Sequence, residues 1–425
     1  MRSTMEKTTT PVITIGLNVN NQAFDYSMEE LKNLVMANNM ENVETVTQKL
    51  DHPDSRAYFG KGKIEYLAQL VTTTGAQVIV ANDELSPSQI RNIENETNAT
   101  VIDRTGLILE IFANRAQTRE AKLQVQMAKL KYQLPRLRTS ASQRLDQQSA
   151  GGGLANRGAG ETKLELNRRT IEHQIDHVRH ELKEIDKAYE TQSKRRKENK
   201  IPTVALIGYT NAGKSTIMNQ LVTKFGENDE KQVFVKNMLF ATLDTSVRDL
   251  HLPDHKQFLL SDTVGFVSNL PHQLVQAFKS TLAEAASANL LVQVVDYSDP
   301  DQQLMMETTE TTLKEIGVPD LPMIKVFNKA DLAGTNYPTR EGDNLIISAL
   351  DDQSIELLTS VISEKLFKNY VTKTFLFPFD KGDLVSTLNH KFNVQSTDYT
   401  EDGTKLTVEL PEPDVARYSQ YLDKD

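Results

Sequence analysis

The sequence predicts a multidomain α/β protein, and three observations in its 425 residues predict it. Short apolar runs alternate with helical stretches over residues 10–112 and again after residue 201, which is typical of parallel sheets covered by helices. A glycine-rich loop stands between an apolar run and a helical stretch at residues 208–215. Between these two regions, apolar residues recur at alternating steps of three and four, as in paired helices.

Residues 1–112 are expected to form an N-terminal α/β subdomain. The stretch from Ser27 to Glu30 has the pattern of a capping box, so a helix is expected to begin at Ser27. Ser86 and Pro87 open a second helix that runs through Ile93. Apolar runs predict three strands, at residues 12–19, 78–81 and 101–103. Because strands alternate with helices, a small parallel sheet is predicted.

Residues 113–200 are expected to form a long antiparallel helical hairpin. The apolar positions of its first half are Leu123, Met127, Leu130, Leu134 and Leu137, and those of its second half are Leu164, Ile171, Ile175, Val178, Leu182, Ile185 and Tyr189. This heptad spacing predicts that the two helices pair. Pro135 is expected to end or kink the first helix. His173, His177 and His180 are expected to be structural or solvent-facing rather than metal ligands.

The tip of the hairpin is a glycine-rich loop at residues 151–160. Its glycines predict a flexible linker, but Arg157 in such a loop also suits a probe that becomes ordered on RNA. The whole chain has a net charge of −10, yet residues 115–200 hold 20 Lys and Arg against 11 Asp and Glu, a local charge of +9. Such asymmetry indicates binding to a phosphate backbone, although solvated helix faces also carry charge runs.

The loop from Gly208 to Ser215 matches the phosphate-binding pattern G-x-x-x-x-G-K-[ST]. It follows the apolar run at residues 204–207 and opens onto a helix, so its backbone N–H groups can cradle phosphates. Lys214 is expected to reach the β and γ oxygens, and Ser215 to offer a hydroxyl to Mg²⁺. The predicted contacts are Gly208, Tyr209, Thr210, Asn211, Ala212, Gly213, Lys214, Ser215 and Thr216. The nucleotide domain is expected over residues 201–368.

Two further loops predict guanine as the base. Asn328, Lys329, Ala330 and Asp331 form an N-K-x-D pattern after an apolar strand, and Asn328 lies 113 positions after Ser215. The Asp331 carboxylate can accept both the N1–H and the 2-amino group of guanine, a donor pair that adenine lacks. Ser348, Ala349 and Leu350 resemble the loop whose backbone N–H meets the guanine O6. Together they favour a GTPase over an ATPase.

Two segments are expected to respond to the third phosphate. Asp262, Thr263, Val264 and Gly265 form a D-x-x-G pattern, in which Asp262 holds the Mg²⁺ shell through water and the Gly265 N–H meets the γ-phosphate. The first switch is expected at residues 240–246, with predicted contacts at Phe240, Ala241, Thr242, Leu243 and Asp244. A hydroxyl there should bind Mg²⁺ only in the triphosphate state, and Thr242, Thr245 and Ser246 all fit by spacing.

The residues after Gly265 predict a slow intrinsic reaction. Phe266 and Val267 stand where Ras-type GTPases place a glutamine, and neither can orient a water molecule. Asn211 offers a substitute, since an asparagine there can hold a potassium ion against the phosphates; the alternative is that it only caps the loop.

Composition excludes several classes of function. The chain has no Cys, which rules out thiolate zinc sites and thiol catalysis. It has no apolar run near 18 residues and no apolar N-terminal signal segment, so a soluble, cytoplasmic protein is expected. We also expect a monomer. Residues 369–425 are expected to form a small C-terminal α/β domain without chemistry of its own.

These motifs together resemble the HflX family of ribosome-associated GTPases. The resemblance covers roughly residues 10–425, and its most specific part is the tract Gly151–Glu161. It also rests on Leu164, Glu165, Arg168 and Arg169, on the phosphate loop, and on residues 240–244 and 262–266. It implies binding to the large ribosomal subunit, with the glycine loop directed toward the peptidyl-transferase region. It also implies splitting or rescue of stalled or idle ribosomes, often under stress, with GTP hydrolysis stimulated by the ribosome.

The resemblance also assigns roles to individual residues. It implies that Thr242 is the switch ligand of Mg²⁺ beside Ser215, and that a hydrophobic residue stands at Phe266. Lys214, Thr242 and Gly265 are then the residues expected to act on the reacting phosphate. Ala159 stands where many relatives have proline, so the stiffness of the tip is expected to differ.

Two other functions fit part of the sequence. A nucleotide-dependent enzyme that remodels rRNA would use the same basic hairpin; some relatives are thought to bind ATP through the N-terminal region, but residues 1–200 contain no second phosphate loop. A signalling switch with protein partners alone leaves the charge of the hairpin unexplained.

Overall fold

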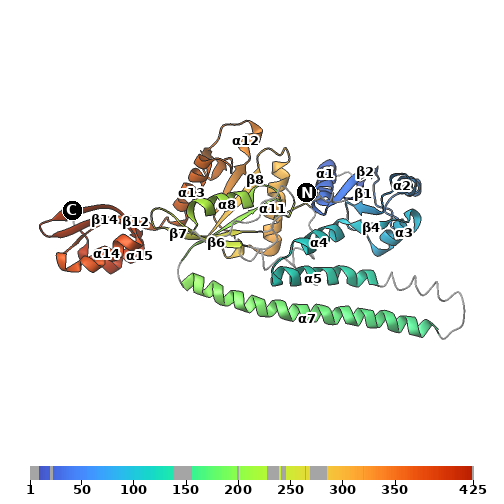
Figure 1. Ribbon diagram of the computed structural model, residues 1–425, viewed down its shortest axis with the longest axis horizontal. Coiled ribbons are helices and arrows are strands. Elements are labelled where there is room, and N and C mark those ends of the chain that lie inside the picture. The colour runs from blue at the N-terminus through green and yellow to red at the C-terminus, as the bar shows by residue number, and fades with distance from the viewer. Residues whose placement is uncertain are drawn as a thin grey trace, which may run out of the picture.

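The structure is a computed structural model of the chain. It describes residues 9–19, 23–137, 156–198, 201–226, 239–240, 246–263, 265–268, 285–318 and 320–423. Three sheets follow one another along the longest axis, and a long helical hairpin lies beside the first two (Figure 1). The alternation of strands and helices therefore builds the multidomain α/β fold that the sequence predicts.

The N-terminal sheet has four parallel strands in the order β2-β1-β3-β4. Its elements are β1 (Thr10–Asn18), α1 (Phe24–Ala37), β2 (Met40–Lys49), α2 (Lys61–Thr74), β3 (Val78–Ala81), α3 (Pro87–Thr97), β4 (Thr100–Asp103) and α4 (Arg104–Arg115). Ser86 caps α3 in a complete capping box with Gln89. Strand β2 is missing from the prediction because it is an edge strand whose residues are mostly exposed and polar.

Helix α1 corrects the predicted capping box at Ser27. The helix begins at Phe24, and its N-cap residue Ala23 makes no side-chain hydrogen bond. Ser27 lies inside the helix, where its hydroxyl donates to Asn82 Oδ1 at 3.2 Å, and Glu30 is buried. The apolar stripe of Phe24, Met28 and Leu31 packs on the core and extends the helix by one turn, so tertiary packing overrides the local cap.

The central sheet has seven strands in the order β10-β11-β9-β8-β5-β7-β6. Its elements are β5 (Thr203–Gly208), α8 (Lys214–Phe225), β6 (Ser246–His251), β7 (Gln257–Asp262), β8 (Leu290–Asp296), α11 (Gln302–Ile316), β9 (Met323–Asn328), α12 (Ala330–Ala333), β10 (Thr339–Glu341), β11 (Asn344–Ile346) and α13 (Asp352–Leu366). Strands β5, β7, β8, β9 and β11 are parallel, and β6 and β10 pair antiparallel at the edges. The loops after the parallel strands therefore meet at one edge, where ligands of such sheets bind.

The helical hairpin consists of α5 (Arg119–Gln133), the short turn η1 (Leu134–Arg136) and α7 (Asn156–Glu198), which lie side by side (Figure 1). Its seam is a separate apolar cluster of Leu123, Met127, Leu130, Ile175 and Val178. The predicted heptad pairing is therefore confirmed over the described side chains. Pro135 lies in η1, directly after α5, as predicted. His173, His177 and His180 are exposed.

The start of α7 differs from the predicted loop at residues 151–160. The backbone is helical from Asn156, so Gly158 and Gly160 lie inside the first turns of the helix. Each glycine costs about 1 kcal/mol relative to alanine in a helix. A helix of 43 residues gains one hydrogen bond for each residue added to an existing nucleus, so it can extend through both glycines.

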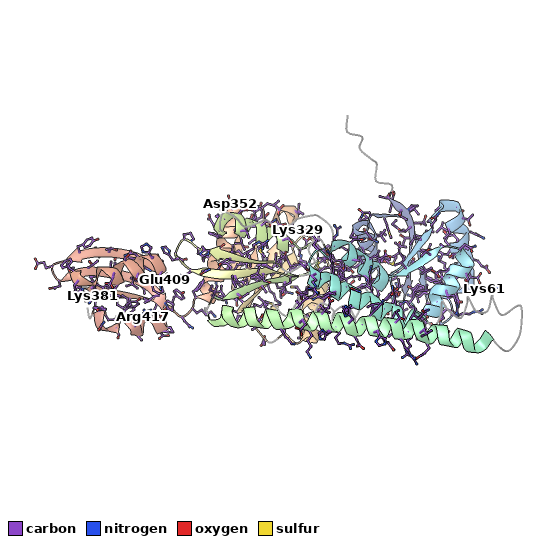
Figure 2. All side chains as sticks on the ribbon, turned by 60° about the horizontal axis from the view of Figure 1, so that its bottom comes forward. Lys61, Lys329, Asp352, Lys381, Glu409 and Arg417 are labelled. Atoms are coloured by element: carbon purple, nitrogen blue, oxygen red, sulfur yellow. The ribbon has the colours of Figure 1, made fainter. Side chains whose placement is uncertain are left out.

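The C-terminal sheet is antiparallel, in the order β12-β14-β13. Its elements are β12 (Tyr370–Phe377), η2 (Phe379–Lys381), α14 (Gly382–Lys391), β13 (Asn393–Thr400), β14 (Gly403–Pro411), α15 (Glu412–Val415) and η3 (Ala416–Tyr421). Lys256, in the turn between β6 and β7, joins this sheet to the central one. Its ammonium group lies 2.9 Å from Asp254 and 2.8 Å from Glu409, which Figure 2 labels at the boundary of the C-terminal sheet.

The N-terminal and central parts share one hydrophobic core. It unites residues of α1 and α4 with Tyr209, Phe240, Phe266 and Val267 of the central part. The rings of Phe112 and Phe240 meet edge to face, with their centroids 4.5 Å apart. The N-terminal helices thus pack directly on the segments that flank the phosphate loop. Among the helices of the described residues, none is both long and apolar enough to span a membrane.

Candidate functional site

The phosphate loop joins β5 to α8 at the carboxyl edge of the central sheet. Gly208 has a φ of 138°, and a Cβ placed on it would lie 2.2 Å from the carbonyl oxygen of Val294 on β8. Gly213 has a φ of 98°, and its Cβ would lie 2.1 Å from Asn328 Nδ2. Both positions therefore require glycine, for backbone conformation and for space. The motif's two glycines let the loop approach its neighbouring strands closely.

Lys214 is held in the loop before any phosphate arrives. Its ammonium group donates to the carbonyl oxygens of Gly208, at 3.0 Å, and Tyr209, at 2.7 Å. The side chain is buried, and this burial lowers its pKa to about 8, while the nearby Asp262 carboxylate acts in the opposite direction. A phosphate would supply the charge partner that the buried ammonium group needs.

Ser215 and Asp262 form the polar pair expected beside Mg²⁺. The Ser215 hydroxyl donates to Asp262 Oδ2 at 2.8 Å. The other carboxylate oxygen, Oδ1, is buried and has no hydrogen-bond partner among the described residues. Burial raises the pKa of Asp262 above its usual value, and Lys214 opposes that shift. A hydroxyl beside an unsatisfied buried carboxylate oxygen is the oxygen-rich donor set that suits Mg²⁺ and its waters.

The loops expected to bind guanine are tied to the phosphate loop by Asn328. This buried side chain donates to the Ala212 carbonyl at 2.9 Å and accepts from the Ala349 N–H at 2.8 Å. The Ala330 N–H donates to Ile347 O at 3.1 Å, which is a second connection between the N-K-x-D loop and the loop at residues 348–350. Asp331 and Leu350 are exposed beside them, as a base-binding edge requires. Ser348 is buried under the loop.

Lys329 has a partner that the sequence analysis missed. Its ammonium group lies 2.7 Å from Asp296 Oδ2, at the end of β8. The position of Asp296, at the carboxyl end of a parallel strand, is the signal that could have identified it.

Gly265 packs closely against the phosphate loop. A Cβ placed on it would lie 2.7 Å from Thr210 Cγ2 and 3.0 Å from the Lys214 ammonium nitrogen. The next residue, Phe266, pairs with the loop: Thr210 N–H donates to its carbonyl at 2.8 Å, and its own N–H donates to Gly208 O at 3.2 Å. Gly265 belongs to the D-x-x-G segment, which is the second of the two segments expected to respond to the third phosphate and is called the second switch below. This switch therefore lies directly beside the phosphate loop.

A buried polar network links this switch to the N-terminal helices. Glu30 of α1 accepts hydrogen bonds from Arg104 of α4, the hydroxyl of Tyr209 and the hydroxyl of Ser268. Arg104 also donates to Ser268 O at 3.1 Å. Burial, followed by the charge of Glu30, raises the pKa of Tyr209. No local motif in the sequence predicts the contacts among Glu30, Arg104 and Ser268.

Some predicted site residues lie outside the described residues. They are Ala241, Thr242, Leu243, Asp244, Thr245 and Val264, together with residues 151–155 of the glycine-rich loop. Of the remaining ones, Thr263 is buried and its hydroxyl donates to Leu206 O at 2.7 Å, while Thr216 lies half-buried at the start of α8.

Three family models match consecutive parts of the chain. The first, described as GTP-binding GTPase N-terminal, matches residues 25–113, and the second, GTP-binding GTPase Middle Region, matches residues 115–196. The third, described as 50S ribosome-binding GTPase, matches residues 203–329, which include the phosphate loop and reach Lys329.

Curated relatives match almost the whole chain, and each is named GTPase HflX. The relative from Caldanaerobacter subterraneus subsp. tengcongensis is 40% identical, over 90% of this chain and 87% of its own length. That from Escherichia coli is 36% identical, over 92% and 91%. Among solved structures, the chain is similar to a GTP-binding protein from Sulfolobus solfataricus in complex with GDP, with 23% identity, a TM-score of 0.44 and coverage of 84% and 99%.

Proposed function

This chain belongs to the HflX family of GTPases, and from that premise we propose that it binds the large ribosomal subunit and splits or rescues stalled or idle ribosomes. Its enzymatic activity is the hydrolysis of GTP to GDP and phosphate. The observation that carries the proposal is the helical hairpin attached to a nucleotide domain. The proposal includes a cytoplasmic monomer with the domain boundaries 1–112, 113–200, 201–368 and 369–425.

The two described helices of the hairpin differ greatly in length. At 1.5 Å per residue, the 43 residues of α7 span about 65 Å, whereas the 15 residues of α5 span about 22 Å. Exposed basic side chains on it include Arg119, Lys122, Arg168 and Arg169. Such groups are available to phosphates of rRNA, although Arg168 and Arg169 also pair with glutamates one turn away.

Other basic residues of the same segment serve the fold. Arg136 donates to Asp103 Oδ2 at 2.8 Å and to Leu85 O at 3.1 Å, and its guanidinium lies over the ring of Tyr132. Arg115 donates to Ala37 O at 3.3 Å. These contacts show that part of the +9 charge stabilises the junction of the hairpin with the N-terminal sheet.

The proposed hydrolytic mechanism uses residues already in place. Lys214, held over the loop, neutralises the β and γ oxygens, and the Gly265 N–H meets the γ-phosphate. Ser215, and Asp262 through water, would hold Mg²⁺, which neutralises charge on the phosphates. Thr242 is proposed as the second protein ligand of this ion. The buried Phe266 cannot orient the attacking water, so the proposed intrinsic rate is slow.

Asn211 is the proposed source of additional charge at the phosphates. It is exposed at the edge of the phosphate loop, in a left-handed conformation with a φ of 63°. An amide oxygen there is free to bind a potassium ion beside the phosphates, which would act as an arginine finger does. Turnover in KCl compared with NaCl, with Asn211→Ser as the control, tests this part.

Purified large subunits test the ribosome proposal. We expect them to raise GTP turnover at least tenfold, and deletion of residues 145–162 should remove that response without changing GDP affinity. Sedimentation with ribosomal particles should show tighter binding with a non-hydrolysable GTP analogue than with GDP. The proposal is refuted if large subunits do not raise GTP turnover and the protein does not sediment with ribosomal particles. RNA unwinding driven by ATP alone would favour the remodelling enzyme instead.

A matched pair of variants tests whether the hairpin makes the contact. Arg168→Gln with Arg169→Gln removes two charges from α7, and Lys373→Gln with Lys381→Gln removes two from the C-terminal part. Each lost phosphate contact lowers the slope of affinity against salt by about 1. We therefore expect the slope to fall by about 2 in the hairpin variant only. Equal slopes in the two variants would place the rRNA contact elsewhere.

A further inference from the structure

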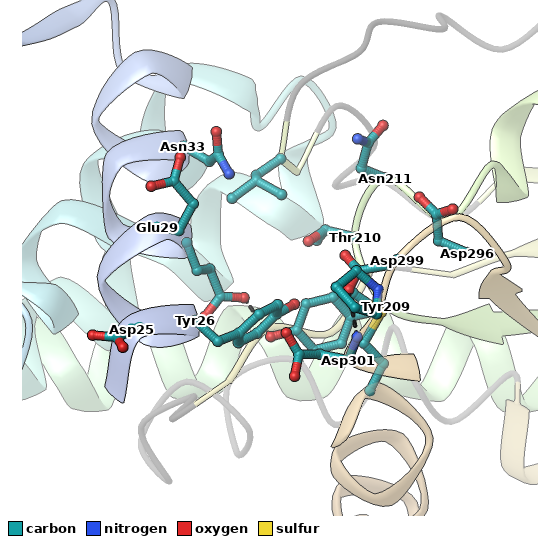
Figure 3. Close-up of a pocket in the computed structure, with 14 residues that line it drawn as sticks. Asp25, Tyr26, Glu29, Asn33, Tyr209, Thr210, Asn211, Asp296, Asp299 and Asp301 are labelled. Carbon is teal, nitrogen blue, oxygen red and sulfur yellow. Dashed lines mark hydrogen bonds between the residues drawn. The ribbon is translucent and has the colours of Figure 1, made fainter. Parts of the chain in front are cut away.

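An acidic cavity lies at the junction of the N-terminal and central parts, beside the phosphate loop. Its volume is about 390 Å³, within the range of pockets that hold small ligands. One wall is α1, and the other walls are the phosphate loop and the segment from the end of β8 into α11 (Figure 3). Asn211, the proposed potassium ligand, lies on its rim, whereas the acidic walls have no part in the functions proposed above.

The lining is strongly negative. Six carboxylates line it, and no lysine or arginine is among its described lining residues; the six are Asp25, Glu29, Glu30, Asp296, Asp299 and Asp301. Neighbouring cations pair with three of them: Glu29 with Lys32, Glu30 with Arg104, and Asp296 with Lys329. Asp25, Asp299 and Asp301 have no such ion pair among the described residues. The cavity therefore has an excess of negative charge, which disfavours anionic ligands and attracts cations.

Two aromatic rings lie between the charged walls. Tyr26 and Tyr209 line the cavity with their centroids 6.5 Å apart, and Figure 3 shows them between Asp25 on one side and Asp296 on the other. Burial, and then the carboxylates of Glu30, Asp299 and Asp301, raise the pKa of Tyr26. Ring faces framed by carboxylates are the environment in which proteins bind organic cations.

Thr210 adds an observation that is independent of charge. This residue lines the cavity and is only 6% exposed, yet its hydroxyl has no hydrogen-bond partner among the described residues. A buried hydroxyl without a partner costs free energy, which a ligand with N–H donors removes by binding. Burial and the neighbouring Asp296 and Asp301 also raise the pKa of Asp299. A bound cation would stabilise the charged form of this carboxylate.

The geometry points to a linear polyamine as the ligand of this cavity. Among the described residues, no group of three His, Asp or Glu side chains could hold a metal ion, so the acidic walls themselves do not form such a site. Carboxylates on opposite walls, with rings between them, match a flexible chain that has ammonium groups at both ends and methylenes between them. A bound polyamine would contact α1 and the phosphate loop together, and would stabilise their junction.

Calorimetric titration of spermidine into the full-length, GDP-bound protein, at fixed KCl and MgCl₂, tests this assignment. We expect saturable binding at one site. Asp299→Asn with Asp301→Asn should weaken it at least tenfold, because asparagine keeps the oxygen that accepts the Asp301 N–H at 2.9 Å but loses the charge. Tyr26→Leu should also weaken binding, and Tyr26→Phe should not.

The matched control is Glu401→Gln with Asp402→Asn, in the exposed turn between β13 and β14. It changes the net charge equally, and we expect unchanged spermidine binding. GDP affinity should be the same in all variants, which shows that the phosphate loop is intact. Equal weakening in the two double variants would mean general charge attraction, and binding of a trilysine peptide but not spermidine would mean a partner's side chain; either result overturns the assignment.

Discussion

Removal of Arg104 is expected to loosen the junction between the N-terminal helices and the second switch. Arg104 and Glu30 have only 2% and 4% of their side chains exposed, so Arg104→Met leaves a buried carboxylate without its cation. Breaking a buried pair in this way costs about 3–5 kcal/mol. If helix α1 opens locally, that cost makes its amides exchange hydrogen roughly 150- to 5,000-fold faster.

Hydrogen exchange measured on peptides from Phe24–Ala37 reports this change, with peptides from β12–β14 as the internal reference. Arg104→Met combined with Glu30→Gln should recover most of the protection, because no charge remains buried and the amide oxygen still accepts from the Tyr209 hydroxyl and the Ser268 N–H. Arg119→Met, which breaks an exposed pair with Glu181, should leave the exchange unchanged. If Arg104→Met has no more effect than Arg119→Met, the reasoning from burial is wrong.

Three further predictions concern the nucleotide site. Since burial lowers the pKa of Lys214 to about 8, and phosphate binding needs the ammonium form, GDP affinity should fall about twofold from pH 7 to pH 8 and about tenfold from pH 7 to pH 9; equilibrium dialysis should show no such fall in Lys214→Arg. Gly213→Ala should weaken GDP binding at least tenfold, whereas Gly317→Ala, also at positive φ but in open space, should leave it unchanged in the same assay. Asn328→Ala leaves the Ala212 carbonyl and the Ala349 N–H without hydrogen-bond partners, which costs about 1–3 kcal/mol each. GDP should therefore dissociate at least tenfold faster in stopped-flow measurements. An unchanged rate would mean that the Asn328 side chain is not needed to keep these loops in place.

Contiguous motifs in the sequence predicted the strand, the loop and the helix around residues 208–215 because these residues lie in one segment. The order strand, loop and helix at Gly208–Ser215 depends on glycine geometry and hydrophobic runs, both of which are local properties. The heptad spacing of Leu123, Met127 and Leu130 likewise predicted which face of α5 meets α7, since helical periodicity alone determines that face.

Contacts between distant residues could not be predicted in the same way. Glu30 is 74 positions from Arg104 and 238 from Ser268, so no spacing rule brings them together. The local pattern at Ser27–Glu30 even suggested a helix cap, because a capping box and a buried polar pair use the same residue types. Edge strand β2 was missed for a related reason, since its polar residues lack the alternation that marks a half-buried strand.

Lys256 connects the C-terminal sheet to the strand that ends at Asp262. It immediately precedes β7, whose six residues end at Asp262, so the two ion pairs of Lys256 lie about 20 Å along one extended strand from that carboxylate. An extended strand transmits tension with little stretch. A partner that pulls on the C-terminal sheet therefore loads the contact between Lys256 and Glu409, together with the chain segment that joins α13 to β12.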